Sequence, residues 1–259
     1  MHPNPAINAI MTEQADWRTL LGQRGETTLD VYIDLKSPHA YLAIRPTLEV
    51  ARDFNVSLNF QPYTLSYKKL GLTKSVETDM QRRPSSASAD RKARMYYAAA
   101  REYAVLQNLP LRSPHRLLDS DLAHRVFLFA KTQNLEIPFA MWVYLQGWSS
   151  GWREFELESY DQLRNACKEV GVDLTSFDEY TQDGGEGSTT LQNTMAIAEE
   201  NGFVGAPHYV FTDPKHGRTV GLFGREHLAL IRAKYKAAGF AKLAETDPEF
   251  SHAWQPTRV

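Results

Sequence analysis

The sequence predicts an α/β protein whose sheet is interrupted by a large, all-helical insertion. Two observations predict this class. Alternating apolar residues, the pattern of strands, occur only towards the two ends of the chain, and the long stretch between them shows only helical spacing. A length of 259 residues with 42% hydrophobic content is enough to bury one large core together with a sizeable inserted lobe.

The chain is predicted to open with a strand, a helix and a second strand. Alternating apolar residues place the first strand at 28–35, and a helical stripe follows at 38–54, with Pro38 in its first turn. The second strand covers 56–60 and stops before Pro62, which lacks a backbone donor. A strand–helix–strand unit in one sheet implies a parallel strand pair with a right-handed crossover.

Residues 66–183 are interpreted as an inserted helical domain. Apolar spacing within it predicts helices at 87–107, 119–134, 139–148 and 158–170. The second of these starts with Asp119 and Ser120, and either side chain is expected to accept a hydrogen bond from the free amides of the first turn.

The sheet is predicted to resume near the C-terminus. The elements expected there are a helix at 190–201 that ends at Gly202, strands at 208–212 and 219–223 that form an antiparallel hairpin, and a last helix at 225–238. The α/β domain is therefore assembled from two stretches, 28–65 and 184–239.

Two terminal segments lie outside this domain. The N-terminal extension, residues 1–27, contains Trp17, Leu20 and Leu21, which are expected either to form a docking helix or to make a dimer contact. The C-terminal tail, residues 240–259, is polar and is predicted to wrap the surface or to fray.

Composition and charge exclude several classes of function. The 29 basic and 31 acidic residues give a formal net charge of -2, which provides no field to hold nucleic acid. No run approaches the roughly 20 apolar residues that span a bilayer, and the N-terminus lacks a signal-peptide pattern, so neither membrane insertion nor secretion is expected. Cys167 is the only cysteine, which excludes an intrachain disulfide and favours a cytoplasmic location, and the histidine spacing predicts no metal site.

Two short motifs carry the chemistry. Ser37-Pro38-His39-Ala40 stands where the first strand ends and a helix begins, and it resembles the Cys-Pro-His-Cys active site of the bacterial disulfide oxidoreductases with both sulfurs removed. Gly205-Ala206-Pro207-His208 directly precedes a strand and resembles the cis-proline loop that faces the active-site helix in thioredoxin folds. A cis bond there would expose the Ala206 amide and carbonyl to an extended peptide.

Together the motifs resemble the branch that comprises the kappa-class glutathione transferases and the 2-hydroxychromene-2-carboxylate isomerases. Its signature, Asp-x-x-Ser-Pro-x-x-Tyr, is represented here by Asp34, Ser37, Pro38 and Tyr41. Further matches lie at 203–207 and at Phe223-Gly224-Arg225. The resemblance implies a DsbA-like thioredoxin fold, glutathione as cofactor, a homodimer, and an isomerase or transferase whose small-molecule substrate is a conjugated or aromatic carboxylic acid.

Ser37 is the expected catalytic residue. Its hydroxyl, at a helix N-terminus, is expected to donate to the glutathione thiolate and to lower the pKa of that thiol from about 8.5 towards neutrality. The other glutathione-binding residues that the resemblance implies are Asn193, Thr194, Val204, Gly205, Ala206, Pro207 and Arg225. Substrate contacts are expected from the insertion, at Lys68, Lys69, Tyr96, Tyr97 and Arg125.

Each assignment has a structural alternative. Ser37 alone is typical of a helix N-cap, and Pro207 of a proline that begins a strand. The asparagine and threonine of the 190–201 helix are equally explained by an exposed helix face, the two lysines by solvated charges, and one of the two tyrosines by packing. Lys36 is expected either to add positive charge for the thiolate or to point to solvent.

Two further functions compete with the enzyme hypothesis. One is a redox-inactive thioredoxin scaffold that captures a peptide or protein partner at Ala206-Pro207. The other is a redox protein that works through Cys167, although a small, half-buried filler on a helix is the expected role of that residue.

Overall fold

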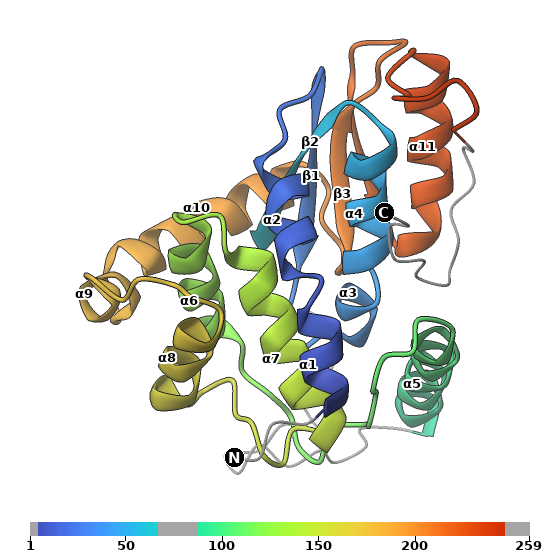
Figure 1. The fold of residues 1–259 in the computed structure, drawn as a ribbon. Helices are drawn as coiled ribbons and strands as arrows, with labels where there is room; N and C mark the ends of the chain where they lie inside the picture. The colour runs from blue at the N-terminus through green and yellow to red at the C-terminus, as the bar shows by residue number, and fades with distance from the viewer. Residues whose placement is uncertain (1–4, 67–86, 247–259) are drawn as a thin grey trace.

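The fold is built on a four-stranded mixed sheet, near the centre of Figure 1. In this computed structural model, which describes residues 5–66 and 87–246, the strands are β1 (Thr27–Ile33), β2 (Val56–Pro62), β3 (His208–Thr212) and β4 (Thr219–Phe223). Their order is β2-β1-β3-β4, with β1 and β2 parallel and the other two pairs antiparallel. The predicted parallel unit and the predicted hairpin are both confirmed, and they share this one sheet.

The helix after β1 is broken where a continuous one was predicted. A short turn of helix, α3 (Pro38–Tyr41), is followed by a separate α4 (Ile44–Asp53). Pro46 explains the break, because it has no N–H to donate to the Leu42 carbonyl and its ring would clash with that carbonyl in an unbroken helix. The break leaves α3 as a separate turn that carries Ser37 at its start.

Helices cover both faces of the sheet (Figure 1). On one face α4 contacts α11 (Leu228–Ala237), which follows the 3-10 turn η2 (Arg225–His227). The Tyr235 ring of α11 packs there against Phe54 and Phe211. α10 (Glu186–Glu200) contacts β2 and contributes Ala198 to a second cluster, whose other buried members are Tyr32, Tyr63 and Val210.

In the described part of the insertion, the regular secondary structure is helical, as predicted. Its helices are α5 (Ala87–Leu106), α6 (Asp121–Lys131), α7 (Glu136–Ser150), α8 (Tyr160–Glu169) and α9 (Phe177–Thr181). α9 was not predicted, because five residues are too few to show a helical period. α6 lies centrally, in contact with α7, α8, α9, α10 and β2, so the insertion and the sheet share one hydrophobic core.

The N-terminal extension docks onto the rest of the chain. It forms α1 (Pro5–Met11) and α2 (Gln14–Gly22), and α2 contacts α4, α7 and β2. Trp17 is fully buried and Leu21 is 5% exposed. Of the two alternatives for this segment, the structure therefore supports the docking helix, and the homodimer stays a prediction.

The start of the C-terminal tail is attached to the domain. Phe240 accepts a hydrogen bond from the Asn55 amide at 2.8 Å, and Ala241 forms an isolated antiparallel bridge with Phe54. Among the helices of residues 5–66 and 87–246, none is both long and apolar enough to cross a membrane.

Candidate functional site

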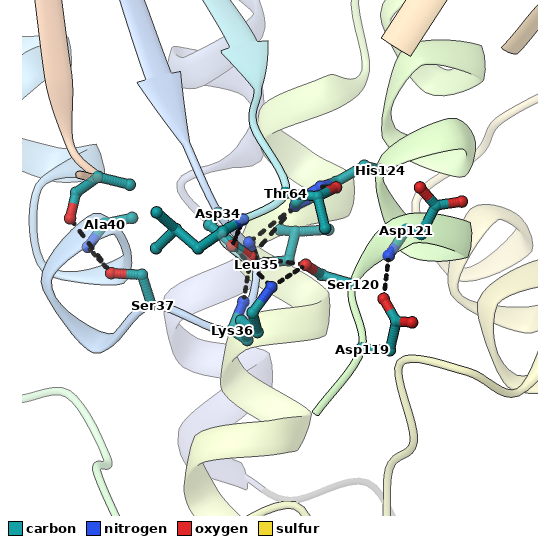
Figure 2. Close-up of polar contacts among 12 residues, drawn as sticks. Asp34, Leu35, Lys36, Ser37, Ala40, Thr64, Asp119, Ser120, Asp121 and His124 are labelled. Atoms are coloured by element: carbon teal, nitrogen blue, oxygen red, sulfur yellow. Dashed lines mark hydrogen bonds and ion pairs between the residues drawn. The ribbon is translucent and has the colours of Figure 1, made fainter. Parts of the chain in front are cut away.

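Ser37 and the cis-proline loop meet at the end of the sheet. The Ser37 hydroxyl accepts a hydrogen bond from the Ala40 amide at 3.2 Å, and it donates to the Ala206 carbonyl at 3.3 Å (Figure 2). The Ala206–Pro207 peptide bond is cis. Ser37 is thus both the N-cap of α3 and the residue that faces the second motif, so its two interpretations are compatible.

Close packing holds the second motif in place. The Gly224 amide donates to the Pro207 carbonyl at 3.0 Å. A Cβ at Gly205 would lie 2.6 Å from the Phe223 ring, so only glycine allows this approach. The aromatic-Gly pair at the end of β4 therefore supports the 205–207 loop, and it places Arg225 directly beside that loop.

A buried carboxylate, Asp34, organises the turn that leads to Ser37. Its Oδ1 accepts hydrogen bonds from the Lys36 amide at 3.0 Å and from the Ser120 hydroxyl at 2.8 Å. Its Oδ2 accepts from the Leu65 amide at 2.7 Å and forms an ion pair with the Lys36 ammonium at 2.9 Å. Figure 2 shows these groups converging from β1, from the segment after β2 and from the start of α6. One side chain therefore joins three distant parts of the chain.

The Asp34 carboxylate stays ionised. Burial alone would raise the pKa of Asp34, but the neighbouring Lys36 ammonium, the largest opposing influence, holds it well below its usual range. The backbone carbonyl of Asp34 is also occupied, because it accepts from the Ser37 amide and from the Tyr144 hydroxyl, both at 2.9 Å. The 34–37 turn is thus fixed by both its side chain and its main chain.

His124 completes this network as a neutral imidazole. The Leu35 amide can only donate, and it lies 3.1 Å from Nε2 of His124, so Nε2 carries the lone pair. Nδ1 then holds the proton and donates to the Thr64 hydroxyl at 2.7 Å. Nε2 also lies 3.4 Å from Oδ1 of Asp34, but a neutral ring makes no ion pair there.

Both expectations for Lys36 were wrong. Its side chain is buried, and its ammonium lies 2.8 Å from the Ser120 hydroxyl and 2.9 Å from the Asp34 carboxylate. The carboxylate neutralises the charge, so Lys36 offers no free positive charge to Ser37. Ser120 is engaged here too, and the α6 amide at Asp121 is capped by Asp119 alone, at 3.0 Å.

A basic and aromatic cluster lies beside α3. The Arg225 side chain is 7% exposed, and its guanidinium carbon lies 3.5 Å from the centre of the Tyr103 ring. The Tyr96 ring meets His39 edge to face at 5.6 Å, whereas the Tyr97 ring packs near Trp148 at 6.4 Å. Of the two neighbouring tyrosines, Tyr96 is therefore the one adjacent to the Ser37 motif.

The other predicted site residues either make their described contacts elsewhere or lie outside the described residues. Arg125 was expected to contact substrate, but its guanidinium donates to the Thr181 carbonyl at 2.6 Å and pairs with Asp183 at 2.8 Å, so it ties α6 to the end of α9. Asn193 is exposed and Thr194 buried on α10, a helix that contacts α6, α9 and β2. Lys68 and Lys69 lie outside the described residues.

Sequence reasoning missed four residues at this site: Thr64, Tyr103, Ser120 and His124. They come from three separate segments, and no local pattern links them to the Ser37 motif. His124 gave the only available signal, because it lies on the apolar stripe of a predicted helix, where a polar side chain requires a buried partner.

The structure gives no support for metal or thiol chemistry in its described part. No group of three or more histidine, cysteine or carboxylate side chains there is arranged to hold a metal ion. Cys167 is fully buried, and burial raises the pKa of its thiol to about 12. Its expected role as a small filler on a helix agrees with this environment, although the side chain is fully buried where half-burial was expected.

The chain is similar to proteins of one fold. The family described as DSBA-like thioredoxin domains matches residues 28–236. A 2-hydroxychromene-2-carboxylate isomerase from Sphingobium xenophagum is 24% identical over 181 residues, which cover 70% of this chain and 86% of that protein.

Solved structures agree with that match. A 2-hydroxychromene-2-carboxylate isomerase aligns with a TM-score of 0.62 and 17% identity, covering 81% of this chain and 95% of the other. The cytosolic disulfide reductase DsbM from Pseudomonas aeruginosa, solved with GSH, aligns with a TM-score of 0.54 and 15% identity, covering 82% and 97%. At these identities the structural likeness establishes the fold.

Proposed function

Because the chain belongs to the DSBA-like thioredoxin domain family and presents the Ser37 hydroxyl where that family's redox thiol is expected, we propose that it is a glutathione-dependent isomerase or transferase. Its substrate class is a conjugated or aromatic carboxylic acid. In this proposal Ser37 stabilises the glutathione thiolate and does not itself attack. One observation carries the proposal, namely the contact between the Ser37 hydroxyl and the Ala206 carbonyl beside a cis-proline.

The hydroxyl proton of Ser37 can be redirected at low cost. It is now donated to Ala206 over 3.3 Å, which is long for an O–H···O hydrogen bond, whose usual length is about 2.7 to 2.8 Å. A sulfur anion is a stronger acceptor than a carbonyl at that distance. The Ala40 amide, which already donates to the Ser37 oxygen, strengthens the hydroxyl as a donor.

The residues around Ser37 suit a peptide cofactor. Bound glutathione would supply a thiolate that adds reversibly to a conjugated carbonyl compound. The Ala206 backbone lies where an extended peptide would pair, and Arg225 stands beside that loop with a cation for a carboxylate. An orphaned donor supports the fit, because Nη1 of Arg225 is buried and has no hydrogen-bond partner among the described residues.

The substrate side of the site is formed by the insertion. Tyr96 is 44% exposed, and its ring lies against His39, two residues after Ser37. Burial and the Arg225 charge lower the pKa of His39, so its imidazole is neutral near pH 7. Tyr96 is therefore our main candidate for substrate contact, and Lys68 and Lys69 remain predicted contributors.

Two relatives point in the same direction. One is named as a 2-hydroxychromene-2-carboxylate isomerase, and the other was solved with GSH. At 24% and 15% identity they support the choice of reaction class and cofactor, while the identity of the substrate stays a proposal.

The test is to titrate glutathione on the protein by its ultraviolet thiolate absorbance. We expect the bound thiol in the wild type to titrate at least about one pH unit below the free value of about 8.5, and Ser37→Ala to reverse that shift. Ser159→Ala is the matched control, because Ser159 also caps a helix but lies on α8. Identical titrations in the wild type and Ser37→Ala would contradict the role of Ser37.

A second candidate function is a redox-inactive module that binds peptides or protein partners. It is favoured by one observation: Val204, at the start of the cis-proline loop, is 69% exposed and leaves the loop edge open. Competition between glutathione and unrelated tripeptides separates the two functions. Equal affinity for all of them would favour the binding module.

A further inference from the structure

The helix α5 carries the side of the site that the insertion provides. It lies away from α6, α8 and α9, and its main neighbour among the described elements is α3 (Figure 1). Two of its side chains reach the site: the Tyr96 ring contacts His39, and the Tyr103 ring lies against the Arg225 guanidinium. The groups that fix α5 against α3 therefore fix the geometry of this side of the site.

Gln107 ties the end of α5 to the corner between α3 and α4. Pro46 has no amide to donate to the Leu42 carbonyl, so the helix break leaves this carbonyl in need of another donor. The Gln107 side chain supplies one, because its Nε2 lies 2.8 Å from the Leu42 oxygen. Gln107 and Leu42 are only 2% and 1% exposed, so removing the side-chain amide would cost a buried carbonyl its donor.

Arg45 makes the reverse connection. It lies three residues after Leu42, on α4, and its Nη1 donates to the Gln107 carbonyl at 2.9 Å. Each segment thus binds the main chain of the other through a side chain, as the two partners of a capping box do within one helix. The Gln107 amide in turn donates to the Tyr103 carbonyl at 3.2 Å. This reciprocal bridge therefore acts directly on the turn of α5 that carries Tyr103.

Glu13 brings the N-terminal extension into the bridge. Its Oε1 lies 2.8 Å from Nη2 of Arg45, whose side chain is 4% exposed. A buried guanidinium is unfavourable unless an anion compensates it, and this carboxylate, at the start of α2, does so. The extension therefore does more than cover apolar surface, because it neutralises the cation that holds the end of α5.

We infer that Arg45 and Gln107 are positioning residues for the substrate side of the site, supported by Glu13 as the counter-ion of Arg45. The bridge holds α5 at a fixed separation from α3, so that Tyr96 and Tyr103 stay beside the Ser37 motif. Its effect on a ligand passes through α5. The inference rests on the proposed function for the class of substrate, whereas the attachment of α5 does not depend on that function.

Hydrogen exchange of the full-length protein, measured by mass spectrometry, tests the attachment. In Arg45→Met and in Gln107→Met, the amides of α5 are expected to exchange about 10- to 100-fold faster, because a buried hydrogen-bonding group loses its partner. Glu13→Ala removes the carboxylate that neutralises Arg45 and is expected to give a smaller increase. The amides of β1 are expected to keep their wild-type rates in all three variants.

Gln133→Met is the matched control. Gln133 also donates from Nε2 to a backbone carbonyl, that of Asp173 at 2.9 Å, but it follows α6 on the other side of the insertion. This variant loses the same kind of contact and is expected to leave the exchange of α5 unchanged.

Ligand binding separates positioning from a purely structural role. The probe is 2-hydroxycinnamate, a conjugated aromatic acid, titrated calorimetrically in the presence of saturating glutathione. Arg45→Met and Gln107→Met are expected to weaken its binding about 3- to 30-fold. The bound glutathione thiol is expected to titrate as in the wild type, because both contacts of the Ser37 hydroxyl are kept. Gln133→Met is expected to change neither measurement.

Three results overturn the inference. The first is wild-type exchange of α5 in the folded Arg45→Met and Gln107→Met variants, and if one of them does not fold, the other decides. The second is faster exchange with an unchanged affinity for 2-hydroxycinnamate. The third is a wild type that does not bind 2-hydroxycinnamate. Unchanged exchange in Glu13→Ala removes the extension from the bridge.

Failure of the proposed function gives a different result. In that case the wild type does not lower the pKa of the glutathione thiol. Exchange of α5 and titration with 2-hydroxycinnamate alone then still decide whether the bridge positions this side of the site.

Discussion

The Asp34 carboxylate and the Lys36 ammonium lie 2.9 Å apart, and both are buried at the end of β1. The pair closes the turn that delivers Ser37 to the start of α3, and it is bridged by the Ser120 hydroxyl from the insertion. The geometry of Ser37 therefore depends on residues far from it in sequence. Four predictions test these buried polar contacts and the core around them.

Breaking the Asp34–Lys36 pair is expected to be costly. Asp34→Asn removes the carboxylate that neutralises the buried Lys36 ammonium, and we expect it to lower the free energy of unfolding by about 3 to 5 kcal/mol. The double variant Asp34→Asn/Lys36→Met is expected to recover part of that loss, because it leaves no unpaired charge. Urea unfolding of the four proteins in the cycle measures the coupling.

An ion pair whose carboxylate is exposed provides the control for that cycle. Asp183 pairs with Arg125 at 2.8 Å but its side chain is 97% exposed, so Asp183→Asn is expected to cost about 0 to 1 kcal/mol. Equal losses of unfolding free energy in Asp34→Asn and Asp183→Asn would show that the buried pair stabilises the fold no more than the exposed carboxylate does.

His124 is expected to matter as a hydrogen-bond acceptor. His124→Leu leaves the buried Leu35 amide without its partner, and we expect a loss of about 1 to 3 kcal/mol in the free energy of unfolding. Thr64→Val removes only the other contact of the ring and is expected to cost less, about 0.5 to 1.5 kcal/mol. Chemical denaturation compares the two, and a reversed order would contradict a stabilising role for the contact between His124 and the Leu35 amide.

Glu49 is expected to make stability depend on pH. Burial raises the pKa of this carboxyl to about 7, partly offset by the nearby Arg52. An unfolded glutamate titrates near about 4.3, so between about 4.3 and 7 the folded state holds a proton that the unfolded state has lost. The free energy of unfolding is therefore highest below about pH 4.3, where Glu49 is protonated in both states. It falls by up to about 1.4 kcal/mol per pH unit as the pH rises towards 7, and this loss is complete above 7.

The variant Glu49→Gln keeps a neutral side chain at every pH. It is expected to exceed the free energy of unfolding of the wild type by about 1 kcal/mol at pH 5 and by about 3 to 4 kcal/mol at pH 8, so that the difference grows by about 2 to 3 kcal/mol between the two pH values. Urea unfolding at the two pH values checks this, with the exposed Glu200→Gln as control. Parallel pH profiles for the wild type and Glu49→Gln would exclude a buried, protonated Glu49.

Cys167 is expected to be unreactive in the folded protein. Its side chain is fully buried, and a pKa near 12 leaves almost no thiolate at neutral pH. A chromogenic thiol reagent should therefore react only after urea is added, and Cys167→Ala should keep full activity. Rapid labelling of the native protein would revive the hypothesis of a redox role.

Features governed by short-range rules were predictable from the sequence. The alternation of Leu29, Val31 and Ile33 defined one face of β1, and all three side chains are fully buried. The two motifs around Ser37 and Pro207 were recognised separately, and the structure places them in hydrogen-bond contact. Both successes rest on patterns contained within a few consecutive residues.

Features that depend on tertiary contacts were not predictable. The apolar stripe of 38–54 continues across Leu42 and Ala43, and it concealed the break that Pro46 imposes. Arg125 was assigned to substrate from its order along the chain, which does not reveal that α9 lies against that side of α6. The burial of the Lys36 side chain was missed for a similar reason, because one of its two partners, Ser120, lies in the insertion.

The hydrogen bond from Ser120 to Asp34 also limits which parts of the chain can be removed without loss of the fold. The helical lobe is not a detachable graft on a self-sufficient smaller domain, since its Ser120 hydroxyl hydrogen-bonds both members of the buried Asp34–Lys36 pair. A lineage or an engineer trimming the chain to a minimal scaffold would first have to replace Asp34 and Lys36 with apolar residues. The turn at 34–37 and the lobe therefore have to be altered together.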